Sequence, residues 1–159
     1  GAIIGYTVEE FNQLTDWILE RVPLSYIAIA SWGQNIYLNK VRAEGPNEGR
    51  LINEVVHEHL AGRVPLMATG GINSIEKSRE AIMHAEMVGL SSVFVAEPDF
   101  VAKFQENREE DINLDVGMED IERLAIPKAA FKDIVLMMDY GKSLPQHTRD
   151  EFRKLEENY

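Results

Sequence analysis

The feature that most constrains the fold is an apolar run that ends on two glycines. Residues 64–69 are largely apolar, Gly70 and Gly71 follow, and a helical pattern opens at Asn73 or Ser74. A strand that passes through glycine into a helix is how α/β proteins bring bare backbone N–H groups up to a phosphate. Taken alone, the glycine pair also has a simpler explanation, because glycine after a strand often only allows a tight turn.

Strand and helix patterns alternate along the first two thirds of the chain. Short runs rich in β-formers predict strands, and apolar residues at helical spacing predict helices between them. The predicted strands are 24–31, 64–69 and 87–90, and the predicted helices are 8–22, 51–60 and 74–85. This order predicts an α/β fold with parallel strands joined by right-handed crossovers. We expect the first strand to be buried on both faces.

Capping patterns define several helix ends. Thr7 with Glu10, and Thr148 with Glu151, have the spacing of a capping box, so each pair predicts the start of a helix. In the helix after the glycine pair we expect these residues to face inward: Ile75, Ala81, Ile82 and Ala85. Pro127 precedes a further predicted helix at 128–140, in which residues 134–138 form a buried stripe.

The stretch after the glycine pair makes the interpretation more specific. Residues 85–101 read AEMVGLSSVFVAEPDFV. Together with the glycine pair, this stretch resembles the seventh and eighth strands of the Old Yellow Enzyme family of FMN-dependent oxidoreductases, and the resemblance covers about residues 6–108. The family usually carries Gly-Arg where this chain has Ser91 and Ser92. In the family that arginine normally faces the FMN phosphate.

The resemblance implies that the chain is the C-terminal portion of a (β/α)₈ TIM barrel. Residues 1–108 would be half-barrel β/α units, and residues 109–159 a helical C-terminal extension that packs on the barrel or on a partner subunit. A complete barrel takes about 250 residues, whereas this chain has 159. We therefore expect it to be the second part of a longer enzyme.

The same resemblance implies the chemistry. In the family, FMN takes hydride from NADH or NADPH and passes it to a small electron-poor substrate. Gly70, Gly71, Ser91 and Ser92 are the implied cofactor-binding residues, as part of the FMN phosphate site. The residues that hold the flavin ring and deliver the proton come mainly from the first half of the barrel. We therefore expect no catalytic residue in this chain and no activity from it alone.

Two alternatives stay open. The chain could be half of another phosphate-binding TIM-barrel enzyme that uses no flavin, or a non-catalytic, self-associating half barrel. Ser91 and Ser92 could also simply end a strand, with their hydroxyls bonded to local backbone.

Other catalytic and metal motifs are absent from the sequence. His57 and His59 are two residues apart on a predicted helix and so point in different directions, whereas zinc-binding helices use a spacing of four. We predict no metal site. Neither Gly-x-Ser-x-Gly nor Gly-x-Gly-x-x-Gly occurs. Trp32, at a predicted strand end, is interpreted as a packing residue rather than a wall of an active site.

Composition limits the partners and the compartment. A net charge of −11 and a pI near 4.8 argue against nucleic acid or anionic membranes as partners. No apolar run approaches the roughly 18 residues of a spanning helix, the first residues lack the basic start of a signal peptide, and there are no cysteines. We expect a cytoplasmic protein.

Three parallel strands cannot close a barrel, so the sheet would keep an open face and open edges. The open face would carry Ile27, Ile29 and Leu66 or their alternate neighbours. We expect a second copy to cover it, in a homodimer or higher oligomer.

Overall fold

The computed structural model describes residues 5–30, 33–130, 133–134, 136 and 142–157. The strands are β1 (Ile27–Ile29), β2 (Leu66–Thr69) and β3 (Met87–Gly89). The α-helices are α1 (Val8–Leu19), α2 (Ile52–Leu60), α3 (Ile75–Ala81), α4 (Ser92–Ala96), α5 (Phe100–Gln105), α6 (Ile121–Leu124) and α8 (Gln146–Glu157). Short 3-10 turns are η1 (Ile36–Leu38), η2 (Ile82–His84), η3 (Glu109–Asp111), η4 (Met118–Asp120) and η5 (Lys128–Ala130).

The three strands form one parallel sheet in the order β1-β2-β3. Ile27 pairs with Leu66 at one side of β2, and Met67 pairs with Met87 at the other. Helices α2 and α3 lie between consecutive strands along the chain, as the alternating pattern predicts. The predicted fold class, α/β with parallel strands followed by a helical tail, is confirmed.

The two faces of the sheet differ in burial. Leu66 and Ala68 are fully buried and share an apolar cluster with Val56 and Leu60 of α2. On the opposite face Ala28 is exposed, and Met67 is only half-buried. The expectation that the first strand is buried on both faces is therefore wrong. Ala28 lies on the face opposite the apolar cluster with α2, whereas full burial of a strand requires a layer on both faces.

Helix α1 begins as the sequence predicts. The Thr7 hydroxyl accepts a hydrogen bond from the Glu10 N–H at 3.2 Å, and the Thr7 N–H donates to the Glu10 carboxylate at 2.7 Å. The capping box is confirmed. Asp16 on this helix contacts both His59 and Arg63, at 2.9 and 2.7 Å, which fixes α1 against the end of α2.

The inward face of α3 is predicted correctly except at one position. Ile75, Ala81 and Ala85 are buried, but Ile82 is 50% exposed. The helix ends at Ala81, and the chain then tightens into η2. The change from 3.6 to 3 residues per turn rotates Ile82 away from the face that its spacing predicts.

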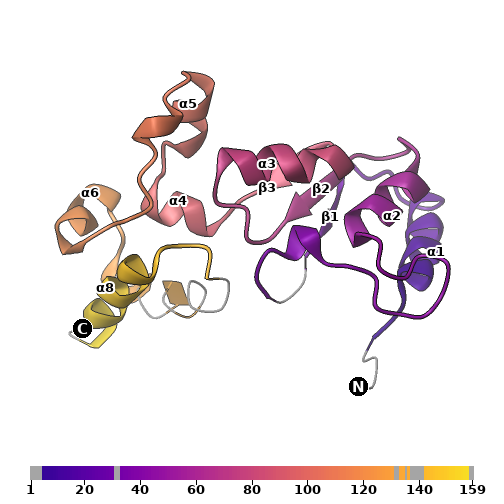
Figure 1. The fold of residues 1–159 in the computed structure, drawn as a ribbon, viewed down its shortest axis with the longest axis horizontal. Coiled ribbons are helices and arrows are strands. Elements are labelled where there is room, and N and C mark those ends of the chain that lie inside the picture. The colour runs from indigo at the N-terminus through magenta and orange to yellow at the C-terminus, as the bar shows by residue number, and fades with distance from the viewer. Residues whose placement is uncertain (1–4, 31–32, 131–132, 135, 137–141, 158–159) are drawn as a thin grey trace.

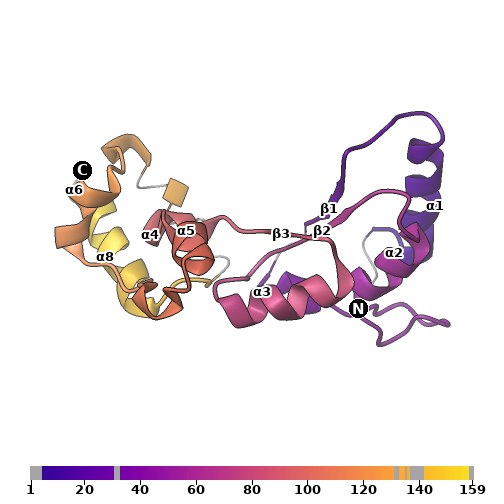
Figure 2. The ribbon, with the colours of Figure 1, turned by 90° about the horizontal axis from the view of Figure 1, so that it is seen from above.

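The molecule is elongated, with a sheet lobe that holds the strands and α1 to α3 on one side and a helical lobe that holds α4, α5, α6 and α8 on the other (Figures 1 and 2). The described residues begin shortly before α1 and end in α8. The helical lobe has an apolar cluster of its own, which contains Ala96, Val116, Leu144, Phe152 and Leu155. A smaller cluster of Ile75, Val93 and Phe100 lies where the lobes join.

The predicted capping box of the last helix is wrong. Helix α8 starts at Gln146, so Thr148 lies inside it and is fully buried. The Thr148 hydroxyl donates to the Leu114 carbonyl at 2.8 Å and accepts from the Val116 N–H at 3.0 Å. This hydroxyl therefore fixes the helix to a distant segment rather than capping its own first turn.

The predicted helix at 128–140 is described only in part. Residues Lys128–Ala130 form a 3-10 turn, and Ile134 packs against the cluster of the helical lobe. Leu136 is 68% exposed, so its assignment to a buried stripe is wrong. Residues 135 and 137–140 lie outside the described residues.

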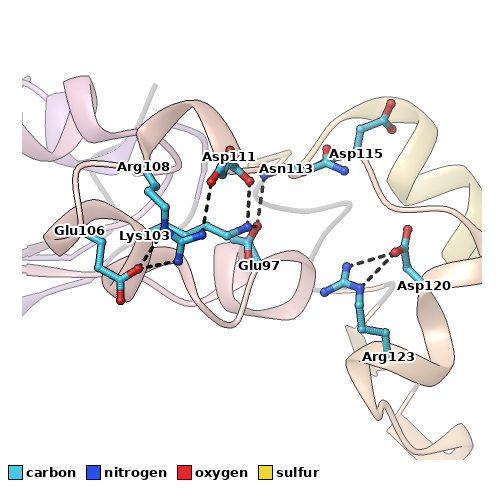
Figure 3. Close-up of polar contacts among 9 residues, drawn as sticks. All are labelled: Glu97, Lys103, Glu106, Arg108, Asp111, Asn113, Asp115, Asp120 and Arg123. Atoms are coloured by element: carbon cyan, nitrogen blue, oxygen red, sulfur yellow. Dashed lines mark hydrogen bonds and ion pairs between the residues drawn. The ribbon is translucent and has the colours of Figure 1, made fainter.

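A buried ion pair holds the segment after α5 in place (Figure 3). Glu97 is 3% exposed, and its carboxylate accepts from the Lys103 ammonium and, at 3.2 Å, from the Asn113 N–H. The Lys103 ammonium also donates to the Asp111 carbonyl at 2.8 Å. These bonds connect α4, α5 and the chain that leads into the tail.

Candidate functional site

A pocket of about 300 Å³ lies at the carboxyl ends of β2 and β3. Ligand sites of open parallel sheets lie at this edge, where loops from neighbouring strands meet. The residues that line the pocket are Ile36, Thr69, Gly70, Gly71, Ile72, Gly89, Leu90, Ser91, Ser92 and Ser143. The structure therefore brings together all four residues that the sequence singles out as cofactor-binding.

The glycine pair has a backbone that other residues rarely adopt. Gly70 and Gly71 have φ angles of 91° and 80°. A Cβ atom on Gly71 would lie 2.4 Å from the backbone nitrogen of Asn35, and one on Gly70 would lie 2.6 Å from the side chain of Ile36. Only glycine fits at either position, because both the backbone angle and the close neighbour exclude a side chain.

Helix α3 holds the loop that lies against the glycine pair. The Lys77 ammonium donates to the Asn35 side-chain oxygen at 3.2 Å and to the Gly71 carbonyl at 3.3 Å. One turn on, the Glu80 carboxylate accepts from the Tyr37 hydroxyl at 2.8 Å. Burial together with this carboxylate raises the pKa of Tyr37 to about 12, so the hydroxyl stays protonated at neutral pH.

The serine pair forms the opposite side of the pocket. Helix α4 begins at Ser92, and the Ser91 side chain does not cap it. The N–H groups of a helix's first turn lack acceptors within the helix. Within the part of the chain that the structure describes, neither the Ser91 nor the Ser92 hydroxyl makes a hydrogen bond. Both hydroxyls remain available to a bound group.

The described lining of the pocket contains no charged side chain. Its polar groups are hydroxyls and backbone groups, and no carboxylate is among them. This set of neutral donors suits a phosphate oxygen, which accepts hydrogen bonds and repels carboxylates. The Lys77 ammonium donates to the carbonyl of Gly71, one of the lining residues.

Sequence reasoning missed two polar residues of the pocket, Thr69 and Ser143. Ser143 comes from the tail, and its carbonyl accepts from the Asn73 side-chain amide at 2.6 Å. Asn73 and Ser143 are 70 positions apart, and no local motif marks Ser143. The apolar residues Ile36 and Leu90 were also not predicted to line the site.

The histidines are engaged in separate contacts. The His57 ring contacts the Glu86 carboxylate at 2.8 Å, and the other carboxylate oxygen accepts from the Leu66 N–H at 2.7 Å. His59 instead contacts Asp16. Among the described residues no cluster of three or more potential metal ligands occurs. Trp32 lies outside the described residues.

None of the helices in the described ranges is long and apolar enough to cross a membrane.

The sequence of this chain was also compared with those of known proteins. No family model matches the chain. The chain is 49% identical over all of its 159 residues to an uncharacterized oxidoreductase of Streptococcus pyogenes serotype M5, and it covers 40% of that protein. It is 26% identical over 132 residues to a probable NADH-dependent flavin oxidoreductase of Bacillus subtilis, covering 82% of the chain and 34% of that protein.

A shorter part of the chain is similar to an enzyme of a different name. Over 94 residues, 59% of the chain, it is 27% identical to the 4-hydroxy-tetrahydrodipicolinate synthase of Brucella abortus, of which it covers 30%. The chain thus spans well under half the length of the curated relatives it matches. It is homologous to part of an oxidoreductase, and more distantly to part of a flavin oxidoreductase.

Proposed function

We propose that this chain is the C-terminal segment of an FMN-dependent NAD(P)H oxidoreductase of the Old Yellow Enzyme type, and that it supplies part of the FMN phosphate site. The observation that carries the proposal is the pocket in which Gly70, Gly71, Ser91 and Ser92 meet. The oxidoreductase homology supports the reaction class, and the name of the Bacillus relative supports flavin and NADH.

The pocket fits a phosphate better than a whole flavin. Its volume of about 300 Å³ is at the lower end of the range for ligand sites. The glycine pair lets the phosphate approach the backbone, and Ser91 and Ser92 offer two hydroxyls from the other side. When bound, FMN would accept hydride from NAD(P)H and pass it to a small electron-poor substrate. This chain would position the cofactor and keep its phosphate hydrogen-bonded.

Serine in place of the family's arginine weakens the phosphate contact without removing it. A hydrogen bond to an ionised phosphate is charge-assisted whichever side chain donates it, but arginine adds a full positive charge and can donate two bonds, whereas serine donates one. The difference is on the order of 1 kcal/mol, or up to roughly tenfold in affinity. Further donors in the pocket can offset a loss of that size.

The test uses the parent, meaning the longer protein that we propose contains this chain. The parent should purify yellow with bound FMN, while residues 1–159 alone should bind FMN weakly or not at all, because the part that holds the flavin ring is missing. In the parent, Ser92→Arg should tighten FMN by up to roughly tenfold. A colourless parent that cannot be reconstituted with FMN would refute the proposal.

The similarity to a 4-hydroxy-tetrahydrodipicolinate synthase favours one alternative. In that alternative the chain is half of another phosphate-binding TIM-barrel enzyme that uses no flavin. The absorbance spectrum of the parent distinguishes the two, since only a flavoprotein absorbs near the flavin band.

A further inference from the structure

Ser143 belongs to the pocket although it lies in the tail. It is 7% exposed, and it lines the same pocket as the glycine pair and the serine pair. Its hydroxyl makes no hydrogen bond within the residues that the structure describes. The Ser143 hydroxyl oxygen is not among the fully enclosed side-chain atoms that lack a partner, so it is open to the pocket, where a ligand can accept its hydrogen bond.

The position of Ser143 is fixed from two directions. On one side its carbonyl accepts from the Asn73 side-chain amide at 2.6 Å, and Asn73 directly follows the pocket residue Ile72. On the other side Leu144 is buried in the apolar cluster of the helical lobe. The tail therefore presents Ser143 to the pocket through contacts to both lobes.

The chemistry of the lining explains why a third hydroxyl would matter. The described lining residues include no arginine or lysine, so a phosphate there depends on neutral donors. Ser91 and Ser92 supply two hydroxyls from the start of α4, and Ser143 adds one from a separate segment. Donors from three separate loops can surround a tetrahedral phosphate, whereas one loop reaches only one side of it.

We propose that the Ser143 hydroxyl is a ligand of the FMN phosphate, and that Asn73 is the residue that positions it. The inference rests on the proposed FMN function, and it assigns to the tail a direct part in cofactor binding. The Ser143 hydroxyl thereby compensates in part for the arginine that the family usually carries at the position of Ser92.

The experiment compares two ligands that differ only in the phosphate. The dissociation constants of FMN and riboflavin are measured by fluorescence titration with the apo form of the parent. Ser143→Ala should weaken FMN about three- to tenfold, the loss of one hydrogen bond, and leave riboflavin unchanged. Asn73→Ala should also weaken FMN alone, and the double variant should lose little more than Ser143→Ala, because Asn73 acts through Ser143.

The matched control is Ser25→Ala, which removes an exposed hydroxyl before β1 and should change neither constant. Melting of each apo variant within a few degrees of the unaltered protein excludes a general loss of folding. If the parent prefers FMN to riboflavin and Ser143→Ala binds FMN as tightly as before, the role of Ser143 is refuted while the FMN function stands. If the unaltered parent binds both ligands equally, the phosphate site itself is refuted, and this inference with it.

Discussion

At the scale of single residues, Glu97 shows how a buried charge is tolerated. Its carboxylate is almost completely enclosed, and it accepts from the Lys103 ammonium and the Asn113 N–H (Figure 3). Burial raises the pKa of Glu97, but these hydrogen bonds outweigh burial and hold the pKa below its usual value. Glu97 therefore remains charged at neutral pH, and the pair depends on both partners.

Removing one partner of the Glu97–Lys103 ion pair should destabilise the fold. Lys103→Met leaves the Glu97 carboxylate buried with too few donors, so we expect the free energy of unfolding to fall by about 3 kcal/mol. Urea denaturation of the chain measures the change. Arg123→Met is the matched control, since it breaks the more exposed pair with Asp120 and should cost less than about 1 kcal/mol. Equal losses in the two variants would contradict the argument.

At the scale of elements, the sequence correctly predicts contacts between residues that lie only a few positions apart. The box of Thr7 and Glu10 closes within one turn, and it forms as predicted. Thr148 has the same pattern with Glu151, yet its hydroxyl bonds the backbone of a segment more than 30 residues away. Spacing alone cannot distinguish these outcomes, because the second depends on which segment packs against the helix.

The same reasoning applies to the pocket. Gly70 and Ser92 lie in motifs that follow strands, and parallel strands bring their carboxyl ends to one edge, so their meeting is predictable. Ser143 enters through a tail whose path is fixed by tertiary packing, and Ile36 enters through a loop held by α3. Neither carries a local signal.

Helix α8 should be held by a pH-dependent contact. The His147 ring contacts the Asp115 carboxylate at 2.7 Å, and this contact raises the pKa of His147. A raised pKa in the folded state means that the stabilisation is complete below the ordinary histidine pKa of about 6.5 and is lost as the pH rises through the folded value. Asp115 lies in the segment that Thr148 also bonds, so the contact supports the docking of α8.

The measurement is thermal unfolding of the chain and of His147→Gln at several pH values. We expect the difference in melting temperature to be largest below pH about 6.5 and to shrink at higher pH. Asp115→Asn should remove the same pH-dependent part. A difference that grows with rising pH would contradict the assignment.

At the scale of the whole molecule, the region of α1 and β1 exposes several large apolar side chains. The exposed apolar residues near α1 and β1 are Tyr6, Leu14, Trp17, Ile18, Val22, Leu24 and Tyr26. Among the residues that the structure describes, the adjoining strand β1 pairs only with β2, so its outer edge is open there. Surfaces of this kind are covered by other protein in native assemblies. In the proposed parent, earlier β/α units would cover this side.

Alone, the chain should therefore associate. We expect a homodimer or higher oligomer at micromolar concentration, held by apolar contacts rather than by charge. Light scattering over a range of protein and salt concentrations measures the association. Replacing Trp17 and Ile18 with serine should weaken it, whereas Met83→Ser, at an exposed position of η2, should not. A compact monomer, or dissociation by moderate salt alone, would contradict this expectation.

The contact between Asn73 and Ser143 spans 70 residues and connects the sheet lobe to a tail with its own apolar cluster. Proteins open in cooperative units, and a unit can detach while the remainder keeps its structure. An opening that releases the tail would remove Ser143 and leave the glycine pair and the β2 pairing intact. The lifetime of the complete pocket is then set by the docking of the tail and not by global unfolding. A bound phosphate group would extend that lifetime by mass action, so cofactor release and tail detachment would become one linked event.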